Sequence, residues 1–224
     1  MLDMGQYRGA LNSMKTAGKT FEEMGRYSDA RNFYEDGLEI ATERGLFSFI
    51  KSFKYELSKI NFIETGKIDL SRELALDCFN YNPKNSDTLK ILSILGMLSF
   101  FDRDYEKSVR FYTQVLDKDK GVSSYHYYMD MFVFYFASKN ELSETISHDE
   151  IVSFFGNNFY SSEEDMYNSI SILNLYALYL IFGKEYHINR LKEDILSKVK
   201  RYSMTDLQKN NYLNSYLLKL MMNE

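Results

Sequence analysis

The side chains that most often perform chemistry in proteins are few and scattered in this sequence of 224 residues. Histidine is the commonest general base and metal ligand, but His126, His148 and His187 have no second ligand at the spacing that a metal site needs. Cys78 is the only cysteine, and no His or Lys beside it in the sequence would activate its thiol. We therefore interpret Cys78 as a buried structural residue, and we predict no catalytic site, no metal and no other cofactor.

Acidic side chains occur in pairs and short runs, such as Glu22-Glu23 and Glu163-Glu164-Asp165. Two carboxylates act as acid and base only when a cleft sets the distance between them, and no pattern here places one opposite another. The run His148-Asp149-Glu150 follows Ser147, which is typical of a helix start with acids near the positive end of the dipole. We expect the acidic residues to lie on solvated helix faces.

The composition favours an all-α fold without a membrane span. Hydrophobic residues make up 45% of the chain, and Pro83 is the only proline, so long windows contain nothing that breaks a helix. The most apolar stretches, 129–137 and 170–182, are shorter than the roughly 20 residues that cross a bilayer. We find no alternating pattern that would predict a strand.

Charge and cysteine content limit the partners and the compartment. The formal net charge is −5, and the basic residues are spread along the chain instead of forming the stripe that follows a phosphate backbone. We therefore expect no direct contact with nucleic acid. A lone cysteine suits a reducing compartment, and the segment 1–7 lacks the features of a signal peptide. Together these features predict a cytoplasmic protein.

Apolar residues recur at steps of three and four along most of the chain, which predicts a series of amphipathic helices joined by short turns. The predicted helices span residues 7–24, 27–44, 46–64, 68–81, 87–101, 105–117, 122–138, 148–156, 163–183, 185–201 and 205–222.

Two of the predicted hairpins are similar in sequence. Aligning Ala17-Gly18 with Leu95-Gly96 places aromatic, small and aromatic residues in register without a gap: Tyr27 over Tyr105, Ala30 over Ser108 and Tyr34 over Tyr112. A looser copy contains Ile68, Ser71, Ala75 and Phe79 and closes on Pro83. This pattern resembles the tetratricopeptide repeat, in which each unit is a helical hairpin of about 34 residues.

The resemblance implies an all-α fold of antiparallel helical hairpins stacked as a right-handed superhelix, an α-α solenoid. It implies a single domain over residues 1–224, with clear repeats over about 11–120, divergent helices over 122–201 and a C-terminal capping helix over 205–222. A non-repeating helical bundle is the alternative, because antiparallel neighbours with short loops also produce hairpins.

In tetratricopeptide arrays the first helix of each hairpin lines a concave face that binds peptides. The matching positions in this sequence are Lys15, Lys19, Phe53, Glu56, Ile60, Ile94, Met97 and Phe101. Some members hold a terminal carboxylate with lysine and asparagine on this face, and Lys15 and Lys19 would suit half of such a clamp. The other positions are mostly apolar, which suits an amphipathic helix or an extended segment with bulky side chains.

Aromatic and methionine residues concentrate in the segment 125–136, which is apolar on nearly all sides. Such a helix is either a central packing layer or, in part, a binding patch, and the first interpretation is the commoner one.

The sequence as a whole favours a non-catalytic adaptor or scaffold that binds a protein or peptide segment. Two alternatives stay open: a peptide-sensing domain of a larger bacterial transcriptional regulator, and a chaperone for secretion or assembly. A homodimer also stays open.

Overall fold

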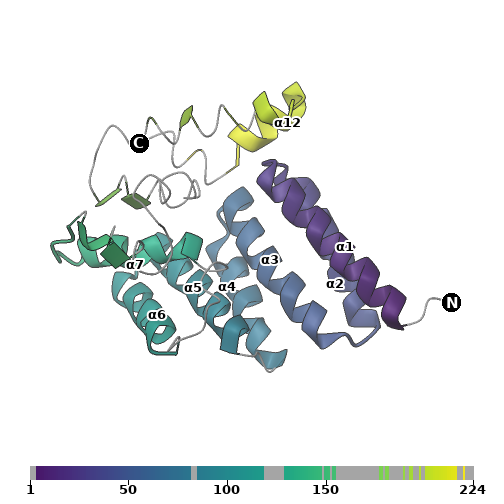
Figure 1. Ribbon diagram of the computed structural model, residues 1–224, viewed down its shortest axis with the longest axis horizontal. Coiled ribbons are helices and arrows are strands. Elements are labelled where there is room, and N and C mark those ends of the chain that lie inside the picture. Colours follow the sequence, from purple (N-terminus) through teal and green to yellow (C-terminus); the bar gives the residue numbers. More distant parts are fainter. Residues whose placement is uncertain are drawn as a thin grey trace. The chain divides into compact units, whose positions relative to one another are not determined.

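The chain folds into helices that belong to two compact units, Met1–Pro83 with Ser197–Glu224, and Lys84–Leu196. All regular secondary structure in the part of the chain that the structure describes is helical (Figure 1). The computed structural model describes residues 4–81, 85–118, 129–147, 149–151, 153–154, 177–178, 180–181, 189, 192–193, 197, 200–215 and 219. The prediction of one continuous domain over residues 1–224 stays a prediction.

The first unit is built mainly from four consecutive helices. Each helix packs against the next, and α1, α2 and α3 lie side by side (Figure 1). These helices are α1 (Met4–Glu23), α2 (Tyr27–Glu43), α3 (Phe47–Thr65) and α4 (Ile68–Asp77), and a 3-10 turn, η1 (Cys78–Tyr81), follows α4. The core shared by α1, α2 and α3 consists of Leu11, Ala30, Tyr34, Ala41, Leu46, Ile50, Phe53, Leu57 and Ile60, and Leu74 of α4 packs against it.

The second unit contains α5 (Asn85–Phe101), α6 (Tyr105–Lys118) and α7 (Met129–Glu141), and α7 packs against both of the others. Phe134 and Phe136 of α7 are buried. This burial favours the core interpretation for the end of the aromatic segment, residues 133–136, where burial is described. The buried hydroxyls of Ser108 and Ser138 are hydrogen-bonded at 2.7 Å, which joins α6 to α7.

The predicted helix bounds agree closely with α1 to α6, where short turns and glycines mark the ends. The predicted helix 148–156 is helical at its described residues, 149–151 and 153–154, whereas the predicted helices 163–183 and 185–201 lie largely outside the described residues. At the first of them, the hydroxyl of Ser147 accepts the backbone N–H of Glu150 at 3.0 Å, as expected for a helix start. Within the described residues, no helix combines the length and the apolar character that a bilayer crossing requires.

The predicted C-terminal capping helix is present in part as α12 (Asp206–Leu213). Thr205 caps it: the Thr205 hydroxyl accepts the N–H of Gln208, and the Gln208 side chain accepts the N–H of Thr205. A helix at the end of a linear array is expected to cover the last hairpin. In this chain α12 belongs to the first unit, where Tyr212 packs against the turn between α1 and α2.

Several helices end in the same turn. Gly25, Gly45 and Arg103 have φ angles of 72°, 62° and 61°, and each stands two residues before the next helix begins. In each turn the residue after the one with positive φ donates its backbone N–H to the carbonyl of the residue five positions earlier. In the first turn Arg26 N–H donates to the Phe21 carbonyl at 2.8 Å. This is the Schellman ending, in which the left-handed residue is free of strain only when it is glycine.

Two hairpins have equivalent internal packing, as their sequence alignment predicted. A Cβ at Gly18 would lie less than 3.0 Å from the ring of Tyr34, and a Cβ at Gly96 would lie equally close to the ring of Tyr112. Both tyrosines are 0% exposed. The missing Cβ therefore lets the two helices of each hairpin approach each other at the same position.

This packing predicts opposite effects for glycine-to-alanine changes. Gly18→Ala and Gly96→Ala should each lower the free energy of unfolding by about 1–3 kcal/mol, because the ring cannot keep its place. Gly9→Ala should raise it by about 0.5–1 kcal/mol, because helix propensity improves and no atom lies within 4 Å of the new Cβ. Urea unfolding followed by circular dichroism measures the difference. Equal stability of the Gly9 and Gly18 variants would contradict the proposed packing.

The shared turn predicts a stabilising change in the second unit. Arg103→Gly should raise the free energy of unfolding by about 1 kcal/mol, because glycine adopts a positive φ without the clash between Cβ and the following carbonyl. Urea unfolding followed by circular dichroism measures this change. The control is Arg110→Gly at an exposed position inside α6, which should lower the free energy of unfolding because glycine is unfavourable within a helix.

Candidate partner-binding site

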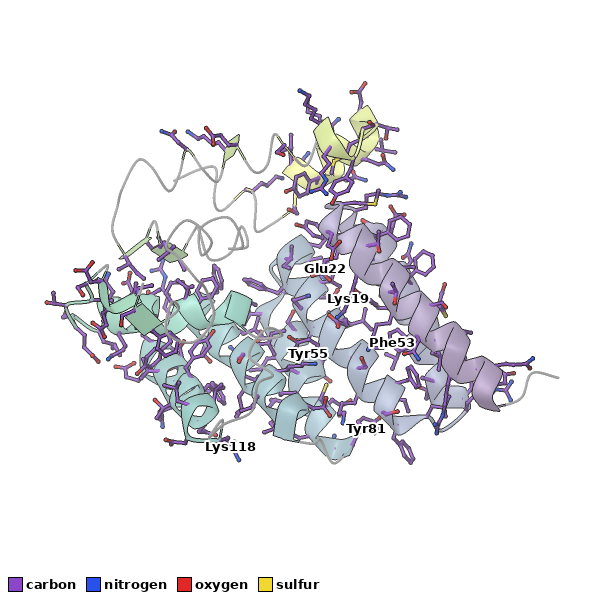
Figure 2. The ribbon with its side chains drawn as sticks, in the orientation of Figure 1. Lys19, Glu22, Phe53, Tyr55, Tyr81 and Lys118 are labelled. Carbon is purple, nitrogen blue, oxygen red and sulfur yellow. The ribbon has the colours of Figure 1, made fainter. Side chains whose placement is uncertain are left out.

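Charged side chains of α1 and α3 form one connected cluster where these helices meet. Figure 2 labels its α1 members Lys19 and Glu22. We call this set, Lys15, Lys19, Glu22, Glu56 and Lys59, the α1–α3 charge cluster. Lys19 Nζ lies 3.4 Å from Glu56 Oε1, and Lys59 Nζ lies 2.5 Å from Glu22 Oε1 and 3.4 Å from Glu56 Oε2. Lys15 Nζ donates to the hydroxyl of Ser52 at 3.3 Å.

The helical repeat explains why these residues meet. Lys15, Lys19 and Glu22 follow one another at steps of four and three, so they share one face of α1. Glu56 and Lys59 are three apart on α3. The two faces are brought together because α1 contacts α3 beside the α2 helix that separates them in sequence.

Solvent exposure differs across the cluster: its carboxylate Glu56 is buried, and its amine Lys19 is partly exposed. The Glu56 side chain is 6% exposed, whereas that of Lys19 is 42% exposed. Burial raises the pKa of Glu56, but the attraction of Lys59, Lys19 and Lys15 is stronger, so the net pKa is below the usual value. Burial lowers the pKa of Lys59, but Glu22 and Glu56 reverse this, so its net pKa lies well above the usual value. The lowered pKa of Glu56 and the raised pKa of Lys59 keep both of these groups charged at neutral pH.

Tyr34 joins the charge cluster to the packing of the first hairpin. Its hydroxyl donates to Glu22 Oε2 at 3.2 Å, while its ring covers Gly18. Burial, followed by the nearby carboxylates Glu22 and Glu56, raises the pKa of Tyr34, so the hydroxyl stays neutral and acts as a donor. The position of Glu22 is thus fixed by the same contact that sets the spacing of α1 and α2.

Three of the sequence-predicted site residues, Lys15, Lys19 and Glu56, come together in this cluster. The five apolar ones do not form an open groove. Phe53 and Ile60 are 0% exposed and belong to the core of the first unit. The Phe53 ring lies where a Cβ on Gly37 would be, less than 3.0 Å away.

Of the remaining apolar residues, Ile94 and Met97 are buried in the second unit and Phe101 is partly buried there. Ile94 and Met97 are 0% exposed. The ring of Phe101 lies 5.4 Å from that of Phe100 and 5.3 Å from that of Phe134, centroid to centroid. Helical periodicity shows which residues share a face, but it does not show which faces a neighbouring helix covers. Phe53, Ile60, Ile94 and Met97 are therefore buried core residues and do not line an open groove, whereas partner binding at Phe101 stays a prediction.

Glu22 and Lys59 are members of the cluster that the sequence analysis missed. Glu22 was expected on a solvated face, but its side chain is 17% exposed and paired with Lys59. A usable signal was present in α3, where Glu56 and Lys59 stand three apart among apolar residues. Opposite charges three residues apart share one helix face, and such a pair beside apolar residues indicates a buried ion pair, because an isolated buried charge is too costly.

Among the described residues, no three His, Cys, Asp or Glu side chains are grouped as metal ligands. Cys78 is fully buried, as expected, and its sulfur lies 3.5 Å from the Lys51 carbonyl oxygen. The histidines 126, 148 and 187 lie outside the described residues.

Comparison with known proteins gives no relative: no family model, no curated protein and no solved structure matches the chain.

The electrostatics of the cluster predict a pH-dependent role for Glu56. Because the folded state lowers the pKa of Glu56, the stability that its carboxylate contributes is present above pH 4.5 and is lost as the pH falls through the folded pKa. Glu56→Gln should cost about 1–3 kcal/mol of unfolding free energy at pH 7, because it leaves the lysines uncompensated. The difference from the wild type should narrow as the pH falls below 4.5.

Urea unfolding of both proteins at several pH values measures this difference. Glu73→Gln is the matched control, because Glu73 is exposed on α4, and it should change stability little at any pH. A Glu56 difference that does not vary with pH would contradict the assigned role.

Proposed function

We propose that the chain is a non-catalytic helical scaffold that holds a protein or peptide segment against the face shared by α1 and α3. The observation that carries this proposal is the pair of partly exposed lysines, Lys15 and Lys19, anchored above a buried carboxylate. The proposal keeps the cytoplasmic location and the tetratricopeptide-like arrangement that the sequence suggested.

The charge of the cluster favours an acidic partner. Three ammonium groups and two carboxylates leave an excess of one positive charge, in a chain whose net charge is −5. Lys15 Nζ is held by the neutral hydroxyl of Ser52, so that contact does not compensate its charge. A carboxylate of a partner can therefore approach Lys15 and Lys19 while Glu56 remains paired with Lys59.

Prior positioning of the lysines supports binding at this face. Free lysine side chains lose rotamer freedom when they bind, and this loss weakens association. Here Ser52 holds Lys15 and Glu56 holds Lys19, so part of that ordering is present before a partner arrives. The underlying helices pack together through the fully buried rings of Tyr34 and Phe53.

The packing of the hairpins supports the scaffold class. The pairs Gly18–Tyr34 and Gly96–Tyr112 give two hairpins the same internal contact, as expected for copies of one repeat. Because the apolar residues Phe53 and Ile60 of α3 are buried in the core, we expect binding at the α1–α3 face to depend on the charges of the α1–α3 charge cluster. We therefore propose an acidic segment as the partner in place of the amphipathic helix that an apolar groove would suit.

The proposal predicts a selective loss of binding on charge reversal. The double variant Lys15→Glu and Lys19→Glu should lose about ten-fold or more in partner affinity, because two attractive contacts become repulsive. Affinity purification from the native cell extract with quantitative mass spectrometry measures which proteins are retained. Binding of the identified partner should also weaken as the salt concentration rises.

A charge-matched control separates a specific site from general electrostatics. The double variant Lys67→Glu and Lys118→Glu makes the same change in net charge at two exposed positions away from the cluster. It should retain the partner. If both double variants keep, or both lose, the same proteins, the α1–α3 face is not the binding site.

A further inference from the structure

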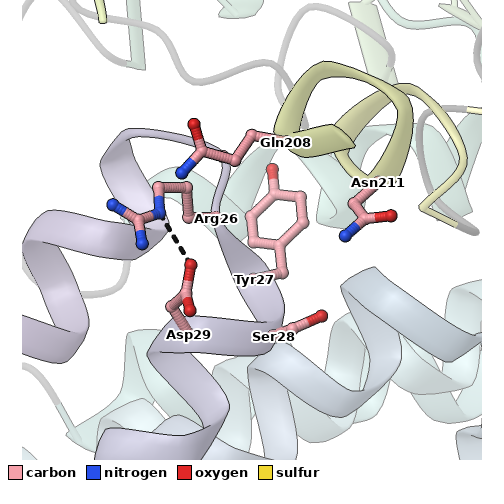
Figure 3. A pocket seen from close by; sticks show the side chains of 7 residues that line it. Arg26, Tyr27, Ser28, Asp29, Gln208 and Asn211 are labelled. Carbon is pink, nitrogen blue, oxygen red and sulfur yellow. Dashed lines mark hydrogen bonds and ion pairs between the residues drawn. The ribbon is translucent and has the colours of Figure 1, made fainter. Parts of the chain in front are cut away.

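The C-terminal helix α12 occupies a surface formed by residues from the other end of the sequence. This surface, which we call the turn surface, consists of the α1–α2 turn and the start of α2, Gly25 to Asp29 (Figure 3). α12 and the turn surface belong to the same compact unit, although more than half of the chain separates them in sequence. The contact is therefore a docking of one segment on another and not a local turn.

Tyr212 is the anchor of this contact. Its side chain is 0% exposed, and its ring lies 5.8 Å from the ring of Tyr27, centroid to centroid. A Cβ on Gly25 would lie less than 3.0 Å from the same ring. Gly25 thus has two roles, because its positive φ ends α1 and its missing Cβ makes room for Tyr212.

The other described residues of α12 are exposed or only partly buried. Leu207 of α12 is 70% exposed, and Tyr212 is the buried residue of this helix. A cavity of about 30 Å³, enough for about one water molecule, lies between the turn surface and the amides of Gln208 and Asn211 (Figure 3). A helix of eight residues is too short to be stable alone in water, so α12 keeps its form largely because Tyr212 is anchored.

We propose that α12 is a releasable latch, and that the turn surface is a docking site for a short tyrosine-anchored helix whose partner in trans is the α12 segment of a second copy of this chain. Within one chain the turn surface already accommodates α12. The α12 of a second copy is identical, so its Tyr212 can make the same contact with Gly25. Reciprocal exchange of the segment between two chains preserves every contact and gives a symmetric dimer.

This inference does not rest on the proposed function, because it uses a different surface of the first unit. The charge-reversal variant at Lys15 and Lys19 should leave it unchanged.

The direct test is binding of a labelled peptide with the sequence of residues 203–215 to the full-length chain, followed by fluorescence anisotropy. The full-length Tyr212→Ala variant, in which the anchor is removed and the surface is vacated, should bind the peptide about ten-fold or more tightly than the wild type, whose own α12 competes. The same peptide with Tyr212→Ala should not bind. Failure of the wild-type peptide to bind the vacated chain, or equal binding of both peptides, would overturn the proposal.

A pair of glycine variants tests the geometry. Added to the Tyr212→Ala chain, Gly25→Ala should abolish peptide binding, because its Cβ takes the place of the ring. Gly45→Ala is the matched control: Gly45 has a similar positive φ of 62° and the same type of turn, but no atom lies within 4 Å of the added Cβ. It should carry the same backbone strain and keep the binding. Undiminished binding to the Gly25 variant would contradict the assigned contact.

Hydrogen exchange of the wild-type chain provides a second measurement that needs no variant. The amides of α12 should exchange through local opening, about ten-fold or more faster than the buried amides of α3, and with little dependence on denaturant. Protection of α12 equal to that of α3 would show that the helix is part of the cooperative core and would overturn the latch.

Discussion

Close contact between a glycine on one helix and an aromatic ring on the next sets the geometry of this protein. The ring of Tyr34 lies over Gly18, that of Phe53 over Gly37, and that of Tyr112 over Gly96. In each case the space of a missing Cβ is filled by a large flat side chain, so the helices approach closely while the ring is fully buried. The other features of the first unit depend on this spacing, because it fixes how far α1 lies from α2 and how α2 supports α3.

The charge cluster follows from the same constraint. Tyr34 covers Gly18 and also holds Glu22, which in turn pairs with Lys59 of α3. A buried carboxylate such as Glu56 is costly to desolvate, and the surrounding lysines offset that cost without necessarily adding stability. What such a network supplies is a defined arrangement of charge. Two lysines are thereby held in place at a partly exposed face, which is the physical basis of the proposed binding site.

The C-terminal helix uses glycine in a related but weaker way. At Gly25 a ring again occupies the position of a missing Cβ, yet Tyr212 comes from a short helix that buries little else. In each hairpin the glycine–aromatic contact is one of many side-chain contacts along two long helices. In α12 the contact of Tyr212 with Gly25 is the principal one, because Tyr212 is the buried residue of this helix. The same local interaction therefore gives a permanent core contact in one place and a separable contact in the other.

Local patterns in the sequence determined the helices, their ends and the internal packing of the hairpins. Steps of three and four located the apolar faces, glycines marked the turns, and the alignment of Gly18 with Gly96 predicted that Tyr34 and Tyr112 have equivalent surroundings. These features depend on residues close in sequence, so the chain encodes them without reference to the rest of the fold. Only the tertiary structure decided that Phe53, Ile60, Ile94 and Met97 are covered, that Glu22 meets Lys59, and that α12 returns to the first hairpin. Each of these depends on which helix covers which face, and periodicity along a single helix carries no information about its neighbours.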